Sequence, residues 1–578
     1  MTSPPAQRDV QVLPVGADSW VLQARSWTRL KFEIEYALQR GTTSNTFLIQ
    51  GAKTALLTPP GETFTALFLV ELERLIPLAR IDYVIVGHIN PNRFKTLLEL
   101  LKLAPHLTIV CSNPGAAALR TLSEAEEVPV GLPELQVIRS QETLDLGRGH
   151  ELHLIPTPTP RWPDGLCVYD TGTAILYTDK FFGAHVCGEP LFEGSETVDN
   201  TDRRYYYDTL MAAQARQVET VLERFETWPA QIYAPVHGPL LRQLGRDILK
   251  HYRAWNREQT SQSLSVALLY ASAYGNTTTL SQAIARGITK AGVAVEAINC
   301  EFASAEEIRS TLEHTAGFII GSPTIGGHVP TPVQTALGIV LSTAGKSQLA
   351  GVFGSFGWSG EAIDLLMGKL QDAGYSFGFE PIRVKFKPTA ATLQQCEEAG
   401  TDFAQALIKK AKRANPPTRQ IDTPVEQAVG RLVGSLSVVT TRQGDAASAM
   451  LASWVSQATF NPPGLTVAVA KDRAIESLMY PGDTFVLNLL KEGKHLPLMK
   501  HFLKPFGPGE DRFAGVETLD AQNGSPVLKD ALAFLECRVA NRMDCGDHWL
   551  VYCTVEAGDV QDSAGKTAVH FRTTGTHY

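Results

Sequence analysis

The sequence predicts a multidomain protein built from an α/β sandwich, a second α/β module and an antiparallel β-barrel. Its 578 residues suffice for three or four domains of about 150 residues each. Apolar strand-length runs alternate with helical segments in the first part of the chain, whereas short strands separated by Gly and Pro fill the last part. A proline-rich polar stretch, 414–424, is typical of an exposed linker. We therefore predict domains at 1–258, 262–412 and 425–578.

Composition and charge narrow the functional classes. The chain has 52 basic and 60 acidic residues, and its net charge of −8 favours neither nucleic acid nor an anionic membrane as a partner. The first residues lack the basic and apolar regions of a signal peptide, and no apolar run reaches the roughly 18 residues of a membrane span. The eight cysteines are scattered, with no CxxC pair. We expect a cytoplasmic protein with reduced thiols and no membrane span.

The first module concentrates polar residues just after predicted strands. Strands are expected at 45–51, 53–59 and 82–87, with an amphipathic helix at 63–78. The last of these strands leads directly to His88, and loops after strands are where α/β layers place their chemistry. Four short stretches carry the candidate residues: HINPNR at 88–93, RWPD at 161–164, LYTD at 176–179 and APVHG at 234–238.

Those four stretches, in this order, resemble the metal-site loops of flavodiiron proteins, whose first module is metallo-β-lactamase-like. The resemblance implies a two-iron pocket. Three positions keep residues that a metal would choose, and three do not. The retained positions are His88, Asp179 and His237, whereas Asn90 and Asn92 stand where the family has carboxylates and Arg161 where it has a histidine.

The three substitutions disfavour iron. Imidazole and carboxylate ligands suit iron, and the carboxylates must offset its charge. An amide is neutral, and a guanidinium stays protonated and cannot ligate. Like unit charges about 4 Å apart repel by about 4 kcal/mol at an effective dielectric of 20. We expect no iron pair of the usual kind, and instead an ion pair from Arg161 or Arg93 to Asp179. The alternatives are a single ion on the three retained residues or a bound anion.

The second module is expected to bind a phosphate group. The uncharged strand 264–270 leads into a loop of small hydroxyl residues and Gly, followed by a helical segment. Backbone N–H groups at such a helix N-terminus cradle an anion, and the absence of a Walker lysine disfavours a nucleoside triphosphate. Two more loops, 322–327 and 355–360, follow strands, and the indole of Trp358 offers a face for a flavin ring.

The three loops together resemble the flavin-binding loops of flavodoxins, which implies FMN as the cofactor. One departure is Gly326, where many flavodiiron relatives carry asparagine. The candidate FMN-binding residues are Ser272, Tyr274, Asn276, Thr277, Pro323, Thr324, Ser355, Gly357, Trp358 and Gly360.

The third module resembles NAD(P)H:flavin reductases in four stretches, at 449–457, 485–488, 546–549 and 568–572. The resemblance implies a second flavin, FMN or FAD, and NAD(P)H as the electron donor. Side chains suited to hydrogen-bond this flavin are Ser453, Trp454, Ser456 and Asn488. His548 and His570 are the candidate catalytic residues near the flavin or the nicotinamide.

The order of the modules resembles the cyanobacterial flavodiiron proteins with a fused flavin reductase, and most of all the subset with substituted iron ligands. The resemblance implies electron flow from NAD(P)H through two flavins towards reduction of oxygen to water, in photoprotection. It also implies head-to-tail dimers, so that a hetero-oligomer with a ligand-complete flavodiiron protein would complete the reaction. The alternatives are an autonomous NAD(P)H:oxygen reductase with unusual ligands, and a chiefly structural or regulatory subunit.

Overall fold

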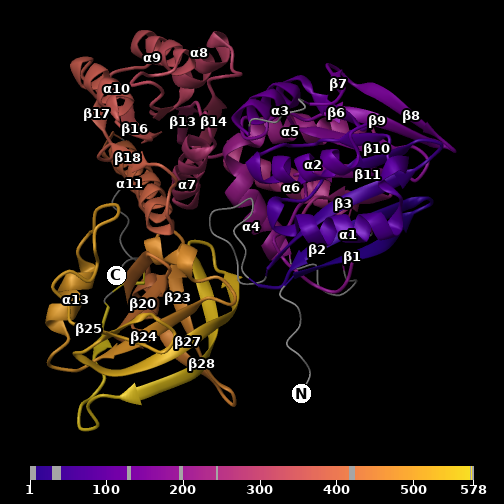
Figure 1. Ribbon diagram of the computed structural model, residues 1–578. Coiled ribbons are helices and arrows are strands. Elements are labelled where there is room, and N and C mark those ends of the chain that lie inside the picture. The colour runs from indigo at the N-terminus through magenta and orange to yellow at the C-terminus, as the bar shows by residue number, and fades with distance from the viewer. Residues whose placement is uncertain are drawn as a thin grey trace. The chain divides into compact units, whose positions relative to one another are not determined.

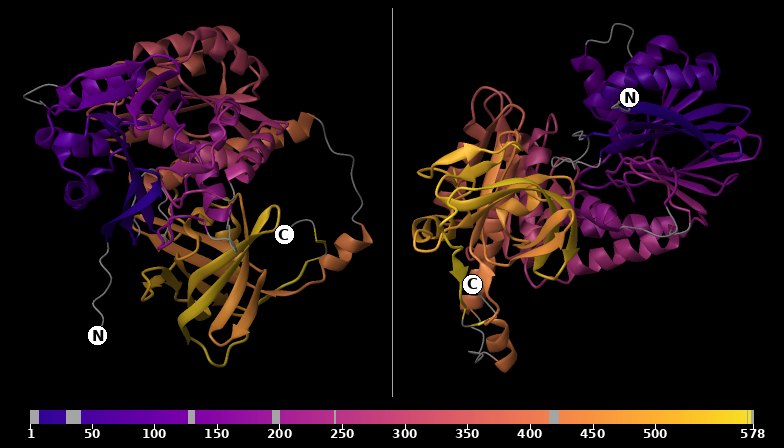
Figure 2. Two further views of the ribbon diagram at one scale, coloured as in Figure 1. Left: turned by 90° about the vertical axis from the view of Figure 1, so that its right-hand side faces the viewer. Right: turned by 90° about the horizontal axis from the view of Figure 1, so that it is seen from below.

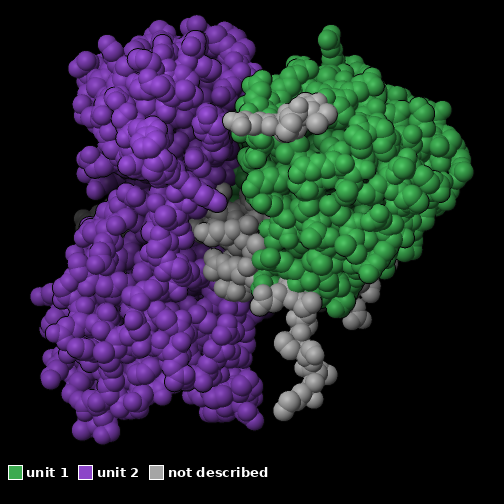
Figure 3. Space-filling model, in the orientation of Figure 1, with its two compact units in different colours: residues 1–261 green, residues 262–578 purple. Residues whose placement is uncertain are grey.

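The computed structural model describes residues 8–28, 41–126, 132–193, 200–242, 245–414, 423–572 and 574–575. It divides into two compact units, Met1–Ser261 and Gln262–Tyr578 (Figure 3). Most of the expected linker, 415–422, lies outside the described residues. Its end begins a short helix, α12 (Pro424–Val429), which the Thr423 side chain and Glu426 cap reciprocally. In the described part of the chain, every helix is too short or too polar to cross a membrane.

The first unit is an α/β sandwich, as predicted. Its first sheet runs in the order β1-β2-β3-β4-β5-β6-β7, antiparallel up to β4 and parallel beyond it. The second sheet runs in the order β12-β11-β10-β9-β8. The strands are β1 (Arg8–Gly16), β2 (Ser19–Ser26), β3 (Thr42–Gln50), β4 (Thr54–Leu57), β5 (Tyr83–Ile85), β6 (Thr108–Ser112), β7 (Leu135–Ile138), β8 (Glu142–Gly147), β9 (His150–Pro156), β10 (Leu166–Asp170), β11 (Ile175–Asp179) and β12 (Ile232–Pro235).

Apolar side chains from the inner faces of both sheets form one core, and a second core lies between the first sheet and its helices. The expected helix at 63–78 is α1, preceded by a 3₁₀ turn at Glu62–Phe64. Packing apolar faces in layers leaves the loops at the strand ends free to carry polar residues. The helices are α1 (Thr65–Leu75), α2 (Pro91–Leu103), α3 (Asn113–Ala125), α4 (Asn200–Leu210), α5 (Ala215–Glu226) and α6 (Gly245–Thr260).

The second unit begins with a parallel sheet in the order β14-β13-β15-β16-β17, with β18 also paired to β16. Helices α8, α9 and α10 share an apolar core with one face of it, and α7 and α11 pack together (Figure 1). The strand order reverses beside β13, which is where such sheets bind ligands. The elements are β13 (Ser265–Tyr270), α7 (Asn276–Lys290), β14 (Ala294–Asn299), α8 (Ala305–His314), β15 (Gly317–Pro323), α9 (Thr331–Thr343), β16 (Leu349–Phe356), α10 (Glu361–Asp372), β17 (Ser376–Phe377), β18 (Ile382–Lys385) and α11 (Ala390–Ala414).

An antiparallel sheet in the order β21-β20-β24-β27-β28-β23-β22 completes the second unit. Only Ser453 and Trp454 connect the edge strand β21 to the opposite edge strand β22. So short a connection reaches about 11 Å at most, so the sheet must roll into an open barrel that brings its edges together (Figures 1 and 2). We call Ser453–Trp454 the seam. The strands are β20 (Ser437–Gln443), β21 (Ala446–Ala452), β22 (Val455–Phe460), β23 (Pro463–Ala470), β24 (Thr484–Leu490), β27 (Ala531–Asp544) and β28 (His548–Val560).

Smaller elements flank the rolled sheet: β19 (Gly434–Ser435), α13 (Leu496–Leu503), β25 (Thr518–Asp520), β26 (Pro526–Leu528) and β29 (Val569–His570).

A buried charge cluster joins this sheet to α7. Arg286 of α7 lies 3.4 Å from Glu476 and donates to the Tyr480 hydroxyl at 2.6 Å, and Arg542 of β27 donates to Glu476 at 2.9 Å. Burial opposes ionisation of Glu476, yet Arg542 and Arg286 hold its pKa below the ordinary value. These contacts explain why 262–578 forms one compact unit.

Candidate functional site

The loop after β5 uses its first substituted residue to start a helix. Asn90 is the N-cap of α2, and its side-chain oxygen accepts a hydrogen bond from the Arg93 backbone N–H at 3.0 Å. Pro91 follows at the first helical position, and Asn92 is exposed on the first turn. The amide that stands where a carboxylate was expected therefore holds the helix end.

His88 is oriented by an aspartate from another loop. Its Nδ1 lies 2.8 Å from Oδ1 of Asp164, and Oδ2 of this carboxylate accepts the Ile89 N–H at 2.9 Å. Burial opposes the charge on Asp164, but His88 and the Ile89 N–H lower the pKa of that carboxyl. Asp164 thus fixes the tautomer and direction of the ring, a role that the sequence did not assign to it.

Arg93 occupies the pocket beside Asp179. Its guanidinium is only 2% exposed, Nη1 lies 3.7 Å from Oδ1 of Asp179, and the same nitrogen donates to the His88 carbonyl at 3.2 Å. The predicted ion pair to Asp179 is confirmed for Arg93. Arg161 lies instead with its Cζ 5.2 Å from the Trp162 ring centre.

The backbone around Asp179 is unusual. Asp179 has φ 45°, and Thr58, which lines the same small cavity, has φ 55°. Such left-handed conformations are costly for residues with a Cβ and cluster at functional sites. A Cβ on Gly87 would lie 2.8 Å from Cγ of Asp179, so only glycine allows the carboxylate to lie there.

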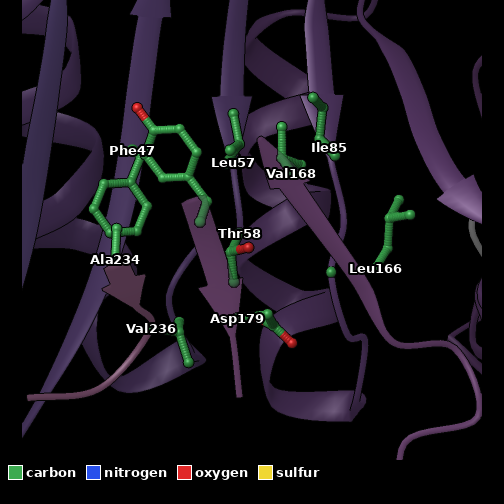
Figure 4. A pocket seen from close by; sticks show the side chains of 11 residues that line it. Phe47, Leu57, Thr58, Ile85, Leu166, Val168, Asp179, Ala234 and Val236 are labelled. Atoms are coloured by element: carbon green, nitrogen blue, oxygen red, sulfur yellow. The ribbon is translucent and has the colours of Figure 1, made fainter. Parts of the chain in front are cut away.

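The cavity beside Asp179 is narrow, with a volume of about 10 Å³, and mostly apolar side chains such as Phe47 and Val168 line it (Figure 4).

His237 lies just after β12, and its Nδ1 donates a hydrogen bond to the Thr43 carbonyl at 2.6 Å. The ring of His185 lies 4.7 Å from that of His237. The sequence motifs did not predict His185, because its position six residues after Asp179 is the one signal for it in the sequence.

Within the described segments, the structure holds no group of three or more His, Cys, Asp and Glu residues arranged around a common metal position. The retained candidate ligands are the imidazoles of His88 and His237, on two different loops, and the Asp179 carboxylate, which faces the Arg93 guanidinium.

The three loops of the parallel sheet converge as predicted. Gly275, with φ 81°, is the N-cap of α7, and Asn276 is the first helical residue. Oγ of Ser272 accepts the Thr278 N–H at 3.2 Å, which closes the first loop. The hydroxyls of Thr277 and Ser355 lie 2.9 Å apart and join it to the third loop. The helix N-terminus and hydroxyls thus form a phosphate cradle.

Aromatic side chains stand exposed beside this cradle. Trp358 is 90% and Tyr274 83% exposed, and the half-exposed Phe386 contacts Trp358 at 6.1 Å between ring centres. Phe386 was missed because it lies beyond the three loops in the sequence, at the end of β18. Oγ1 of Thr324 is buried without a partner in the described residues. Rings that would be covered by a planar cofactor, beside a free hydroxyl, fit a flavin.

The remaining predicted residues shape the loops. Pro323 ends β15 opposite Ser355, Gly357 follows β16, and Gly360 is the N-cap of α10. Gly326 has φ 57°, a left-handed conformation that glycine and asparagine tolerate best.

In the rolled sheet, distant segments meet at the seam. The ring of His548 lies 5.0 Å from that of Trp454, and Cζ of Arg572 lies 4.8 Å from the Trp454 ring centre. Burial and Arg572 lower the pKa of His570. We call Trp454, His548, His570 and Arg572 the seam cluster. Ser453 is buried beside it.

Two further residues predicted to bind the flavin, Ser456 and Asn488, differ in their exposure to solvent. Ser456 is exposed on the edge strand β22. Asn488 is buried, its amide nitrogen lies within 3.2 Å of the Val438 carbonyl and 3.1 Å of the Thr440 hydroxyl, and its oxygen accepts the Leu528 N–H. These bonds join neighbouring strands, so the contact of Asn488 with a flavin stays a prediction.

Three family models match consecutive parts of the chain. The ODP family beta lactamase matches residues 42–238, flavodoxin residues 268–400 and the flavin reductase like domain residues 429–576. The fold and these matches define a flavoprotein with a metallo-β-lactamase-like, a flavodoxin and a flavin reductase module.

The full-length relatives give the particular family. The chain is 64% identical to the "Putative diflavin flavoprotein A 6" of Nostoc sp. over 99% of both chains, and 60% identical to the "Putative diflavin flavoprotein A 3" of Synechocystis sp. over 99% of this chain and 96% of the relative. A solved structure, "Metal soaked Flv1 flavodiiron core" from Synechocystis sp., is 59% identical, covers 70% of this chain and 100% of its own, and has a TM-score of 0.68. The chain belongs to the diflavin flavoprotein A family of flavodiiron proteins.

Replacing Arg93 by methionine should leave the Asp179 carboxylate buried without its cation. We expect the free energy of unfolding of the first unit to fall by about 3 kcal/mol, because an uncompensated buried charge is costly. The double variant Arg93→Met/Asp179→Asn should recover much of that loss. Urea denaturation of the full chain measures both, and strictly additive losses would show that the two residues do not interact.

Replacing Trp358 by alanine should weaken FMN retention by about 1–3 kcal/mol, through lost area and stacking. The matched control is Phe460→Ala, because Phe460 is equally exposed, at 89%, in the third module. FMN content after gel filtration and titration of the apoprotein measure the effect. Equal FMN affinity in the two variants would contradict the assignment.

Proposed function

We propose that the chain takes electrons from NAD(P)H at the third module, passes them to FMN in the flavodoxin module, and delivers them towards oxygen in a partner subunit whose iron ligands are complete. The family and the two flavin modules support electron transfer. One observation carries the need for a partner: the Arg93 guanidinium lies 3.7 Å from Asp179 in the metal-type pocket.

Charge is the physical argument for proposing that this pocket holds no two-iron centre. Two irons bring at least four positive charges, and their ligands must offset them. Here Asn90 caps a helix, and the retained carboxylate faces a fixed cation. A divalent ion about 4 Å from that guanidinium would meet about 8 kcal/mol of repulsion at an effective dielectric of 20, twice the value for unit charges. The residues present do not fit the metal that the family name implies.

The flavin sites, by contrast, fit their cofactor. A bound flavin supplies hydride acceptance and one-electron transfer. The chain's own part at the first site is to hold a phosphate on the N-terminus of α7 and to cover a ring with Trp358 and Tyr274. At the seam cluster, the proposed role of His548 and His570 is to orient a nicotinamide or a flavin edge, and the contact of His548 with Trp454 supports it. His548 is itself held by Asp547, whose carboxylate lies 2.9 Å from its Nδ1.

The proposal includes a head-to-tail pairing with a ligand-complete flavodiiron protein in the cytoplasm, NAD(P)H as donor and oxygen as acceptor. The competing proposal is an autonomous NAD(P)H:oxygen reductase with unusual ligands. It draws on His185, a further imidazole 4.7 Å from the His237 ring in the first unit. The third, a chiefly structural subunit, predicts no NAD(P)H oxidation at all.

Metal analysis after iron-supplemented expression should give far below two irons per chain, because Asn90 and Asn92 carry no charge and the retained Asp179 carboxylate faces Arg93. Reverting Asn90→Glu alone should not restore the centre, since the charge deficit remains and the helix loses its cap. Near two irons per chain with a coupled diiron spectrum would overturn this part of the proposal.

Deleting residues 425–578 should abolish NAD(P)H oxidation and leave FMN on the flavodoxin module. The solved structure of a relative's flavodiiron core, 59% identical, covers 70% of this chain, which supports folding of the truncated chain. The intact chain should reduce artificial acceptors readily, consume oxygen slowly and release peroxide. A truncated chain that oxidises NAD(P)H at the full rate would disprove the reductase assignment, and rapid water formation without peroxide by the intact chain would favour the autonomous reductase.

A further inference from the structure

Arg572 stands in the seam cluster without an assigned role. It follows β29 by two residues, and side chains two apart in an extended segment lie on the same face, so Arg572 and His570 point the same way. Gly434 pairs with His570, and a Cβ on it would lie 1.7 Å from the Ser453 carbonyl oxygen. The face of this segment that carries the side chains of His570 and Arg572 therefore packs against the seam.

The intervening residue confirms this direction, because Phe571 is exposed to solvent. Arg572 is only 9% exposed, with its guanidinium 4.8 Å from the Trp454 ring centre. Contact with the indole face partly offsets the desolvation of the cation.

The guanidinium lacks a counter-charge. Among the described residues, Arg572 forms no ion pair, and its Nη1 is buried with no hydrogen-bond partner. Arg542 in the same module is also buried, but it donates to Glu476 at 2.9 Å. Burying a charged donor without a partner costs several kcal/mol, so such a group is normally satisfied by an ion or ligand.

We infer that Arg572 binds the phosphate group of a nucleotide cofactor at the seam. This inference rests on the proposed reductase function and adds the anchor of its ligand. The Trp454 ring holds one face of the guanidinium plane, and the donor edge is left for phosphate oxygens, which match its fork geometry. The phosphate belongs either to the flavin or to the nicotinamide dinucleotide, and both present the same chemistry to Arg572.

The test uses the full chain, stripped of flavin, and the variant Arg572→Gln. The control is Arg431→Gln, which removes the same charge from an exposed position in the same module. Each protein is titrated with FMN, FAD and riboflavin, and the KM for NADPH and NADH is measured after flavin is restored. Thermal unfolding checks that the apoproteins are equally folded, and Arg572→Lys, which keeps the charge but not the fork, replaces the glutamine variant if that one does not fold.

If the phosphate is that of the flavin, Arg572→Gln should weaken one of the two FMN-binding steps about tenfold to a hundredfold and leave riboflavin binding unchanged. If it belongs to the dinucleotide, the flavin titrations should be unchanged and the KM for NADPH, NADH or both should rise by a similar factor. Two outcomes overturn this inference alone, provided that the wild-type protein binds two flavins. In the first, Arg572→Gln has the same affinities and KM values as the wild-type protein for every ligand. In the second, Arg572→Gln loses riboflavin affinity as strongly as FMN affinity. Wild-type protein that binds one flavin and oxidises no NAD(P)H overturns the proposed function and the inference together.

Discussion

The buried guanidinium of Arg93 beside Asp179 is the constraint on which the metal-type pocket depends. The pair is 3.7 Å apart and nearly inaccessible to water, so neither charge can be removed without leaving the other uncompensated. Its position follows from the helix cap at Asn90, which places Arg93 in the first turn of α2. Gly87 then leaves room for the carboxylate, which sits at a left-handed backbone position. Cap, cation and glycine together define a pocket whose retained carboxylate already has a partner, and this is why we assign oxygen chemistry to another subunit.

Buried arginines also distinguish structural from ligand-binding positions elsewhere in the chain. Arg286 and Arg542 surround Glu476, so their charges are satisfied within the protein and join α7 to the rolled sheet. Arg572 has an indole face but no carboxylate in the described residues. The difference lies in what faces each guanidinium: the Glu476 carboxylate at Arg286 and Arg542, and the Trp454 ring at Arg572. We therefore propose an anionic ligand for Arg572 and a purely structural role for the other two.

The sequence predicted the sandwich, the parallel sheet and the rolled sheet, because strand periodicity and turn residues are local signals. It also placed Trp358, Thr277 and Ser355 correctly on converging loops, since the ends of parallel strands meet at one edge. What it missed depends on contacts between distant segments. Local pattern could not choose between Arg93 and Arg161 as the partner of Asp179, nor show that Asp164 orients His88. The internal bonds of Asn488 were equally invisible, because they depend on strand pairing 40 to 50 residues away.

All three candidate sites lie at the ends of strands or between them: at strand ends in the sandwich, in the loops after the parallel strands beside β13, and at the seam that connects β21 to β22. The apolar cores lie between the layers and contain none of the substituted residues Asn90, Asn92 and Arg161. Ligand residues can therefore be exchanged without disturbing the packing that holds the fold. At the metal-type pocket this exchange is constrained by charge, because the buried Arg93 cation faces a carboxylate. Asp179 is that carboxylate, so we propose that a residue of a metal-type pocket serves here as a counter-ion, in a chain whose proposed task is electron transfer.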